Sequence, residues 1–374
     1  MSSIVRYLST VSVFMMLSVS ALYSQRRDVN YDEAKVPQYE LPDPLIFENG
    51  KKVKNVRQWM GKRRPEVVEV FAQEMYGHVP AVSEGVHFAL VSQREVYGGL
   101  GVRKVVRIFL DESDSHWFDV LIHLPKGVEG PVPIFVGLNF KSNAATLDER
   151  ADFRWPYEMV LKAGMGVATA WRDAVEPDGK DSNIKSETDV CRDGGVRSWY
   201  NEGGDWGAIS AWVWGLSRIV DYLETDPDVD AKHVGIEGVS RYGKAALVTL
   251  AFEERFAMGL IGSSGKGGAA LHRRIFGEGL ENLTGSGEYH WMAGNYLKYA
   301  SIESKTGAWT ADMLPVDSHQ LIALCAPRLV FISYGIPEQG DALWLDQYGS
   351  WQATIAAGEA FKLLGAKDLG RSND

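Results

Sequence analysis

The chain has 374 residues, of which 45% are hydrophobic and 24% are charged, a composition typical of a folded globular protein rather than a disordered or fibrous one. Its 39 Lys and Arg residues against 49 Asp and Glu residues give a formal net charge of −10, and the basic residues form no block. This balance excludes an extended surface for the phosphates of a nucleic acid, so we expect no nucleic-acid partner.

The N-terminal residues predict an export signal. Arg6 supplies a positive start, an apolar stretch covers 11–23, and small residues lead into a polar run that begins at Gln25. The stretch is too short and too rich in serine to span a bilayer, so we predict no membrane span. We divide the chain into a signal peptide at 1–24 and one domain at 25–374. The mature protein is expected in the periplasm or outside the cell, as a monomer.

The rest of the chain predicts a regular succession of helices and strands. Residues 25–60 are polar and loop-rich, and apolar residues then follow helical spacing over 64–76. From 206 onward, strands and helices alternate, which favours a mostly parallel sheet with helices on both faces, a three-layer α/β sandwich. Strands are predicted at 86–92, 104–110, 117–124, 134–138, 167–171, 233–237, 257–262 and 328–333, and helices at 64–76, 156–163, 206–223, 241–254, 318–325 and 349–364, with a long irregular segment after 262.

One serine lies where a strand turns sharply into a helix. The predicted strand at 233–237 is followed by Gly238, Ser240 and a helix-forming run. A serine at such a turn has its hydroxyl lifted above the edge of the sheet, as a catalytic nucleophile requires. The usual pattern is Gly-x-Ser-x-Gly, whereas here the second glycine comes one place later, at Gly243. A helix N-cap is the alternative for this serine, but the strand-to-helix context favours the nucleophile.

Two cations follow the serine. Arg241 comes next in the chain and places its backbone N–H as an oxyanion donor, and Lys244 lies one helical turn beyond Ser240 on the same face. The start of a helix favours acidic residues, so a basic pair there is poorly placed for helix stability alone. In an acidic chain, this pair indicates a substrate that carries negative charge or many oxygen atoms.

The sequence from Gly238 to Lys244, Gly-Val-Ser-Arg-Tyr-Gly-Lys, resembles the signature Gly-Cys-Ser-Arg-x-Gly-Lys of the glucuronoyl esterases (4-O-methyl-glucuronoyl methylesterases, carbohydrate esterase family fifteen). Further blocks resemble this family in the same order, at 263–273, 287–291, 314–328 and 343–345. The resemblance implies an α/β-hydrolase fold and a serine carboxylesterase. Its substrate would be esters of 4-O-methyl-glucuronic acid in glucuronoxylan, such as the link to a lignin alcohol, and no cofactor or metal is implied.

The same resemblance assigns roles to single residues. Arg241 would help to hold the oxyanion, and Lys244, Glu288 and Trp344 would contact the glucuronoyl sugar. A tryptophan face suits the C–H surface of a sugar ring, while lysine and glutamate can bind its hydroxyl groups. His290 and His319 lie in blocks that we interpret as scaffold. Trp291 and Trp351 are expected in the core.

The chain departs from the family at the acid of the catalytic triad. The usual acid stands 23 residues after the nucleophile, where this chain has Ser263 (263 − 240 = 23). Some bacterial members carry the acid after the next strand instead, and Glu338 and Asp341 are available there. A carboxylate is needed to orient the catalytic histidine. We predict Asp341, because it is closer to Trp344.

The second departure concerns the catalytic histidine. In this fold the triad order is Ser, acid, His, and the histidine follows one further strand. The sequence ends at Asp374, before that strand. We therefore expect a domain that is incomplete at its C-terminal end, with its last strand missing. None of the eight histidines should bond to Ser240, and these 374 residues should be nearly inactive.

Two alternatives and one open question remain. The chain could be another carbohydrate esterase, such as an acetyl xylan esterase, or a sugar-binding hydrolase homologue without turnover. The missing acid at Ser263 and the absent histidine favour the second alternative. The two cysteines, Cys191 and Cys325, could pair or not. The apolar surroundings of Cys325 predict a buried, inert thiol.

Overall fold

The computed structural model describes residues 29–369 apart from 83, 147–154, 180–194, 200–204, 286 and 300–310. The predicted signal peptide and Cys191 lie outside the described residues. None of the helices in the described part of the chain has the length and apolar character that a membrane span requires.

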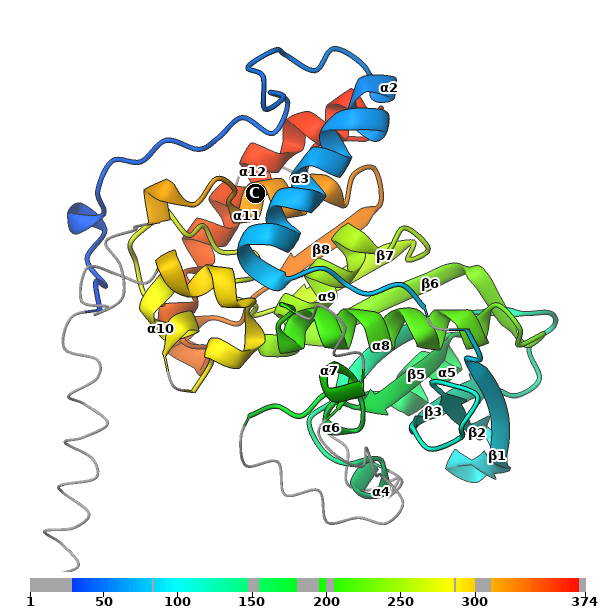
Figure 1. Cartoon of the computed structure of the whole chain (residues 1–374). Coiled ribbons are helices and arrows are strands. Elements are labelled where there is room, and N and C mark those ends of the chain that lie inside the picture. Colours follow the sequence, from blue (N-terminus) through cyan, green and yellow to red (C-terminus); the bar gives the residue numbers. More distant parts are fainter. Residues whose placement is uncertain are drawn as a thin grey trace, which may run out of the picture.

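Eight strands form one mixed sheet, in the order β1-β2-β3-β5-β4-β6-β7-β8 (Figure 1). Strands β5, β4, β6, β7 and β8 pair in parallel with their neighbours in this order. The pairs β1–β2, β2–β3 and β3–β5 are antiparallel. Short connections are sufficient for the antiparallel pairs, but parallel neighbours need longer crossovers. The strands are β1 (His87–Val96), β2 (Gly101–Phe109), β3 (Trp117–Pro125), β4 (Val132–Asn139), β5 (Gly166–Trp171), β6 (Val229–Val239), β7 (Met258–Gly262) and β8 (Leu329–Ser333).

The two faces of the sheet are covered by different helices. On β4, Ile134 and Val136 belong to the main hydrophobic core together with α8, whereas Phe135 packs with Tyr157 of α5. Successive residues of a strand point to opposite faces, so α5 and α8 lie on opposite sides of the sheet. The helices are α2 (Val56–Gln58), α3 (Arg64–Phe71), α4 (Asn143–Thr146), α5 (Tyr157–Lys162), α6 (Arg172–Val175), α7 (Val196–Trp199), α8 (Ala208–Leu223), α9 (Arg241–Phe252), α10 (Leu280–Thr284), α11 (Ser318–Leu324) and α12 (Gln347–Leu363).

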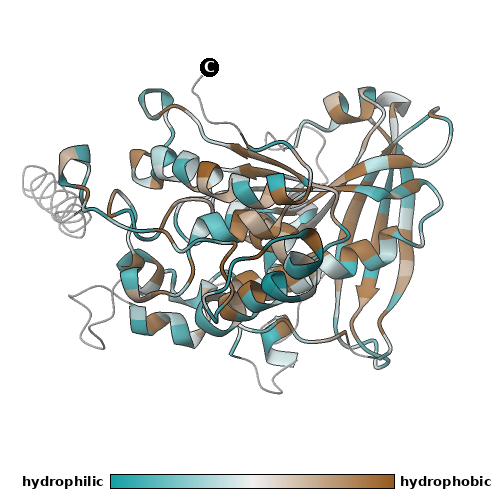
Figure 2. Ribbon diagram, turned by 90° about the horizontal axis from the view of Figure 1, so that it is seen from above, coloured by the Kyte–Doolittle hydropathy of each residue, from teal (hydrophilic) through white to brown (hydrophobic). Residues whose placement is uncertain are grey.

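This arrangement confirms the predicted three-layer α/β sandwich with a mostly parallel sheet. Helices α8 and α9 lie side by side across one face (Figure 1). Figure 2 shows apolar residues concentrated along the strands and polar residues on outer helix faces and loops. Every predicted strand and helix is present, with ends shifted by a few residues. After β7, the described residues up to α11 form the five-residue helix α10 and a few 3-10 turns, in agreement with the predicted irregular segment.

Strand β8 is the last strand of the sheet in the described residues and pairs only with β7. Its alternate side chains Leu329 and Phe331 are 71% and 59% exposed. The edge of a sheet carries backbone groups without ladder partners. The missing last strand stays a prediction.

A buried histidine lies on the antiparallel side of the sheet. His123 of β3 is fully buried, and neither ring nitrogen has a hydrogen-bond partner among the described residues. Its ring lies 4.2 Å from the ring centre of Tyr157. Burial, helped by the charges of Arg103 and Arg94, lowers the pKa of His123 to about 3. The folded protein therefore keeps this ring neutral.

This neutral histidine predicts a loss of stability in mild acid. An unfolded histidine has a pKa of about 6.5, so the unfolded chain takes up a proton below that pH whereas the folded chain does so only near the lower value. Between pH 7 and pH 5, His123 should cost about 2 kcal/mol of unfolding free energy. We measure the unfolding free energy by urea denaturation at pH 7 and at pH 5. The drop between the two pH values should be about 2 kcal/mol smaller in His123→Phe than in wild type. The same change at the exposed His233 is the control, and an unchanged acid dependence in His123→Phe would contradict the assignment.

Candidate active site

Ser240 lies in a strained turn between β6 and α9. Its backbone has φ 59° and ψ −130°, a conformation that residues with a side chain rarely adopt and that clusters at functional sites. A Cβ atom at Gly238 would lie 2.0 Å from the carbonyl oxygen of Tyr242, and one at Gly243 would lie 2.5 Å from that of Gly262. Both glycines are therefore needed, the second where α9 contacts the end of β7. Gly243 is thus required at its own position, one place later than the usual second glycine.

The hydroxyl of Ser240 is not used to cap the helix. Ser240 is the N-cap residue of α9, yet its side chain makes no capping hydrogen bond. The alternative of a simple N-cap is therefore not supported. The side chain is partly exposed at the carboxyl edge of the parallel strands, next to the N–H groups of the first helical turn.

Asp341 lies at the same edge, on the loop after β8. Ser240 N–H donates to the Gly262 carbonyl at 2.9 Å and Ser263 N–H to the Ser333 carbonyl at 2.8 Å, so the ends of β6, β7 and β8 are adjacent. The Asp341 carboxylate accepts from the Ser263 hydroxyl at 2.8 Å and from two backbone N–H groups. The carboxylate thus contacts the very residue that replaces the usual acid. Glu338, in contrast, is exposed on the turn Pro337–Gln339.

Lys244 points into the protein rather than into open space. The residue is 3% exposed, and its Nζ donates to the carbonyl oxygens of Ser264 and Lys266 at 2.8 and 2.5 Å and lies 3.4 Å from both carboxylate oxygens of Glu278. An ammonium group has three N–H donors. A sugar hydroxyl would have to displace one of these acceptors, so the predicted sugar contact of Lys244 is not preformed.

Glu278 was not found by sequence reasoning, although it connects two predicted site residues. Its carboxylate pairs with Lys244, and its backbone N–H donates to the carbonyl oxygen of Trp344 at 2.7 Å. The preceding Gly277 has φ 62°, and a Cβ atom there would lie 2.3 Å from that same carbonyl. Trp344, in the turn Leu343–Leu345, is partly exposed. The structure therefore brings Lys244 and Trp344 together through Glu278.

Glu288 interacts electrostatically with Glu278, Lys244 and Arg241. Its Oε2 atom is buried without a hydrogen-bond partner among the described residues. Burial, with the nearby Glu278 carboxylate, raises the pKa of Glu288 to about 7, against the lowering effect of Lys244 and Arg241. Near neutral pH this side chain can therefore either donate or accept a hydrogen bond from a sugar hydroxyl.

Like Glu278, Asp178 was not indicated by the sequence, and it holds the guanidinium of Arg241. The Arg241 Nη1 donates to the carboxylate of Asp178 at 2.9 Å, and the Arg241 Cζ lies 4.8 Å from the ring centre of Trp291. The Nζ of Lys244 lies 5.9 Å from the same ring. Trp291 is 3% exposed, as expected of a core residue, but it also contacts both cations of the site.

All eight histidines are described, and none is hydrogen-bonded to Ser240, as the sequence predicts. His290 bonds to Asp178 and His319 to the Pro42 carbonyl, consistent with their interpretation as scaffold. His123 makes no hydrogen bond among the described residues. The other five bond to Glu69 (His78), Gly85 (His87), Asp111 (His116), Asp230 (His233) and Asp317 (His272).

Cys325 is fully buried and free, and burial raises the pKa of its thiol to about 12. A thiol in such surroundings is not a nucleophile, which confirms the predicted inert cysteine. Within the described residues, no group of three or more His, Cys, Asp or Glu side chains could hold a metal ion.

Comparisons with known proteins establish the family. A family model described as "Glucuronyl esterase, fungi" matches residues 109–365, more than half of the chain. The chain belongs to the glucuronoyl esterase family. It is 36% identical over 385 residues to Carbohydrate esterase MZ0003 from an unknown prokaryotic organism, covering 93% of this chain and 84% of that protein. It is 29% identical over 347 residues to the 4-O-methyl-glucuronoyl methylesterase of Schizophyllum commune, covering 88% and 74%.

Solved structures of glucuronoyl esterases share the fold. The carbohydrate esterase family 15 glucuronoyl esterase from Teredinibacter turnerae T7901 superposes with a TM-score of 0.79 at 34% identity, covering 92% of this chain and 83% of that one. A promiscuous esterase of the same family from a marine bacterial metagenome gives a TM-score of 0.77 at 34% identity, covering 92% and 91%. The predicted α/β-hydrolase fold is therefore confirmed.

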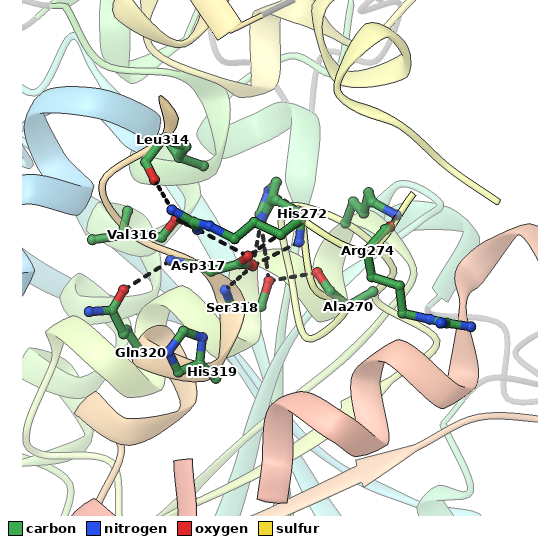
Figure 3. Close-up of polar contacts among 12 residues, drawn as sticks. Ala270, His272, Arg274, Leu314, Val316, Asp317, Ser318, His319 and Gln320 are labelled. Atoms are coloured by element: carbon green, nitrogen blue, oxygen red, sulfur yellow. Dashed lines mark hydrogen bonds and ion pairs between the residues drawn. The ribbon is translucent and has the colours of Figure 1, made fainter. Parts of the chain in front are cut away.

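In this glucuronoyl esterase fold, the buried Asp317 anchors the segment after β7, which also carries Glu278. Figure 3 shows Asp317 and its polar contacts. Asp317, the N-cap of α11, accepts hydrogen bonds from the backbone N–H groups of His272, Arg273 and Ser318 at 2.7 to 3.1 Å. The Arg273 guanidinium lies 3.2 Å from the same carboxylate. Although burial alone would raise the pKa of Asp317, the hydrogen bond and charge of His272 hold it well below its usual range. The carboxylate is thus ionised and ties the segment after β7 to α11.

We expect Asp317→Ala to be strongly destabilising, because it leaves the buried Arg273 guanidinium with backbone carbonyls but without its counter-charge, and three buried N–H groups without this acceptor. The loss should be about 3–5 kcal/mol of unfolding free energy, measured by urea denaturation. Asp312→Ala, a truncation of a nearby exposed carboxylate, is the control and should change stability by less than about 0.5 kcal/mol. Equal stability of the two variants would show that Asp317 does not anchor this segment.

Proposed function

We propose that this chain is a serine esterase that hydrolyses esters of 4-O-methyl-glucuronic acid in glucuronoxylan, including links to lignin alcohols. The observation that carries this proposal is Ser240, held in a strained strand-to-helix turn with its hydroxyl uncapped beside Arg241. Relatives named 4-O-methyl-glucuronoyl methylesterase support the substrate class.

The geometry fits a two-step acyl transfer. The Oγ atom of Ser240 attacks the C6 carbonyl carbon of the ester, and the carbonyl oxygen takes the negative charge. The backbone N–H and the guanidinium of Arg241 stabilise that oxyanion. A base takes the proton of Ser240 and gives it to the departing alcohol. A water molecule then gives a proton to the base and its hydroxide to the glucuronoyl–serine ester, which releases the free acid while Ser240 regains its proton.

The sugar is recognised by side chains that the fold gathers near Ser240. The partly exposed Trp344 offers a face for the C–H surface of the ring, and Glu288 offers an unmatched carboxylate oxygen for a hydroxyl. Lys244 acts indirectly, because it pairs with Glu278, whose backbone N–H holds the carbonyl of Trp344. An acetyl ester needs none of these groups, which makes an acetyl xylan esterase the weaker assignment.

The mechanism needs a base that accepts the proton of Ser240. None of the eight histidines is hydrogen-bonded to Ser240, so none is in place for this role. We propose Asp341 as the acid of the triad, which would stabilise an imidazolium at the ends of β7 and β8. The same observation favours a second candidate function, the binding of glucuronoxylan without turnover. Release of the alcohol from a bound ester separates the two.

We further propose that the protein is exported and acts as a monomer. The charge pattern of residues 1–24 supports a signal peptide, and a polysaccharide substrate requires an enzyme outside the cytoplasm. The N-terminus of the exported protein should then begin at about residue 21 to 26.

The nucleophile can be tested by supplying the base from solution. Because no histidine bonds to Ser240, added imidazole should accelerate methanol release from methyl 4-O-methyl-glucuronate by wild type. Ser240→Ala should remove this acceleration, by about 10²-fold or more, because imidazole then has no hydroxyl to deprotonate. Methanol is measured enzymatically, and the matching galacturonate ester should react at least about tenfold more slowly.

Two outcomes would contradict this account. Equal imidazole-dependent rates in wild type and Ser240→Ala would exclude Ser240 as the nucleophile. Binding of the ester by wild type with no methanol at any imidazole concentration would favour the binding function instead.

The role of Asp341 predicts a second difference. Asp341→Asn should lower the imidazole-dependent rate by about tenfold or more, because a neutral amide does not stabilise an imidazolium beside Ser240. Glu338→Gln, the same change at an exposed carboxylate of the same loop, should leave the rate within about twofold. If Glu338→Gln lowers the rate and Asp341→Asn does not, the acid is Glu338.

A further inference from the structure

Asp178 is a nearly inaccessible carboxylate with an unusual number of donors. Its side chain is 2% exposed. One oxygen accepts from Arg241 Nη1 at 2.9 Å and from the Tyr242 hydroxyl at 3.0 Å, and the other accepts from Trp291 Nε1 at 2.8 Å and His290 Nε2 at 3.1 Å. A carboxylate offers about four acceptor positions, and all of them are in use.

These partners come from separate parts of the fold. Asp178 follows α6, Arg241 and Tyr242 open α9, and His290 and Trp291 belong to the 3-10 turn Tyr289–Trp291. The Nε atom of Arg172 in α6 lies 3.8 Å from the same carboxylate. One buried anion therefore joins the start of the nucleophile helix to two other segments. Although burial would raise the pKa of Asp178, hydrogen bonds from His290 and Trp291 and the charge of Arg241 hold it well below its usual range, so it is ionised.

The cluster fixes the guanidinium of Arg241 from two directions. Asp178 accepts from its Nη1, and the ring of Trp291, itself bonded to Asp178, lies against its face. The Arg241 Nε donor is buried and has no partner among the described residues. An unmet buried donor is costly, and an oxygen atom of a bound ligand can satisfy it. The guanidinium is thus oriented in advance but has hydrogen-bonding capacity left.

We propose that Asp178 is a positioning residue that holds the Arg241 guanidinium in place for the ester carbonyl. This inference rests on the proposed function, in which Arg241 stabilises the oxyanion. A preorganised donor costs no reordering when charge develops, whereas a free arginine side chain must first lose its rotamer freedom. Asp178 acts only through Arg241 and does not touch the reacting atoms.

The key variant is Asp178→Asn. The asparagine oxygen can still accept from Trp291 and His290, but its NH₂ group would face Arg241 with a donor against a donor. The change keeps the shape of the side chain and releases the guanidinium. Tyr242→Phe is the matched control, because it removes a different donor from the same carboxylate oxygen and leaves the Asp178–Arg241 pair intact.

The first measurement needs no substrate. Nitrogen and carbon NMR of arginine side chains reports rotation about the Cζ–Nη bonds, and the Arg241 signal is identified by its absence in Arg241→Lys. We expect restricted rotation in wild type and Tyr242→Phe and free rotation in Asp178→Asn. Equal restriction in Asp178→Asn and wild type would overturn the proposal, whatever the substrate proves to be.

The second measurement connects position to ligand binding. In a Ser240→Ala background, calorimetry gives the Kd of methyl 4-O-methyl-glucuronate, an uncharged ester whose binding does not respond to net charge alone. Asp178→Asn should weaken binding by about tenfold, but by less than about twofold when Arg241→Gln is already present. The same loss in both backgrounds would show that Asp178 does not act through Arg241. Absence of binding with Asp178 and Arg241 both intact would overturn the proposed function, and the NMR result would still decide the role of Asp178.

Discussion

The site depends on the tight turn from β6 into α9 at Ser240. A residue with a side chain at positive φ costs about 1–3 kcal/mol, so the surrounding packing must maintain the turn. Here the backbone of α9 approaches Gly238 from one side, and Gly243 contacts the end of β7 from the other. Because both approaches exclude a Cβ atom, the serine hydroxyl remains at the sheet edge, and Arg241 and Lys244 follow it in fixed directions.

Buried charge organises the groups around this turn. In a chain with a net charge of −10, Lys244 on the nucleophile helix and Lys266 in the segment after β7 are almost fully buried. A buried ammonium must be compensated, and backbone carbonyls and Glu278 do so here. Asp317 performs the same task for Arg273. Residues 263–279, which follow β7, form no helix or strand, and these ionic contacts hold them in place.

The fold was predictable because its inner strands are buried on both faces. The inner strands read as continuous apolar runs, and the alternation with helices left few other arrangements. The strand-to-helix turn at Ser240 was predictable for a local reason, since a strand, a glycine, a serine and a helix follow each other within a few residues. Asp341 was predicted as the triad acid from the family pattern, and its contact with Ser263 arises because both residues lie just after adjacent parallel strands.

The remaining site residues depend on contacts that the sequence does not express. Asp178 precedes Arg241 by 63 positions, in a loop without any motif, and only the packing of α6 against the sheet brings them together. Glu278 lies 34 positions after Lys244 in the irregular segment. Helical spacing correctly put Lys244 on the face of Ser240, but spacing does not show whether a long side chain turns outward or into the protein.

The most direct test of the account is a crystal structure of the Ser240→Ala protein with methyl 4-O-methyl-glucuronate. We expect the ester carbonyl carbon next to the Cβ atom of residue 240, with its oxygen within hydrogen-bonding distance of the Arg241 backbone N–H or guanidinium. The sugar ring should lie against Trp344, with a hydroxyl bonded to Glu288. A sugar bound elsewhere on the molecule, or with its ester group directed away from residue 240, would contradict the assignment of this site.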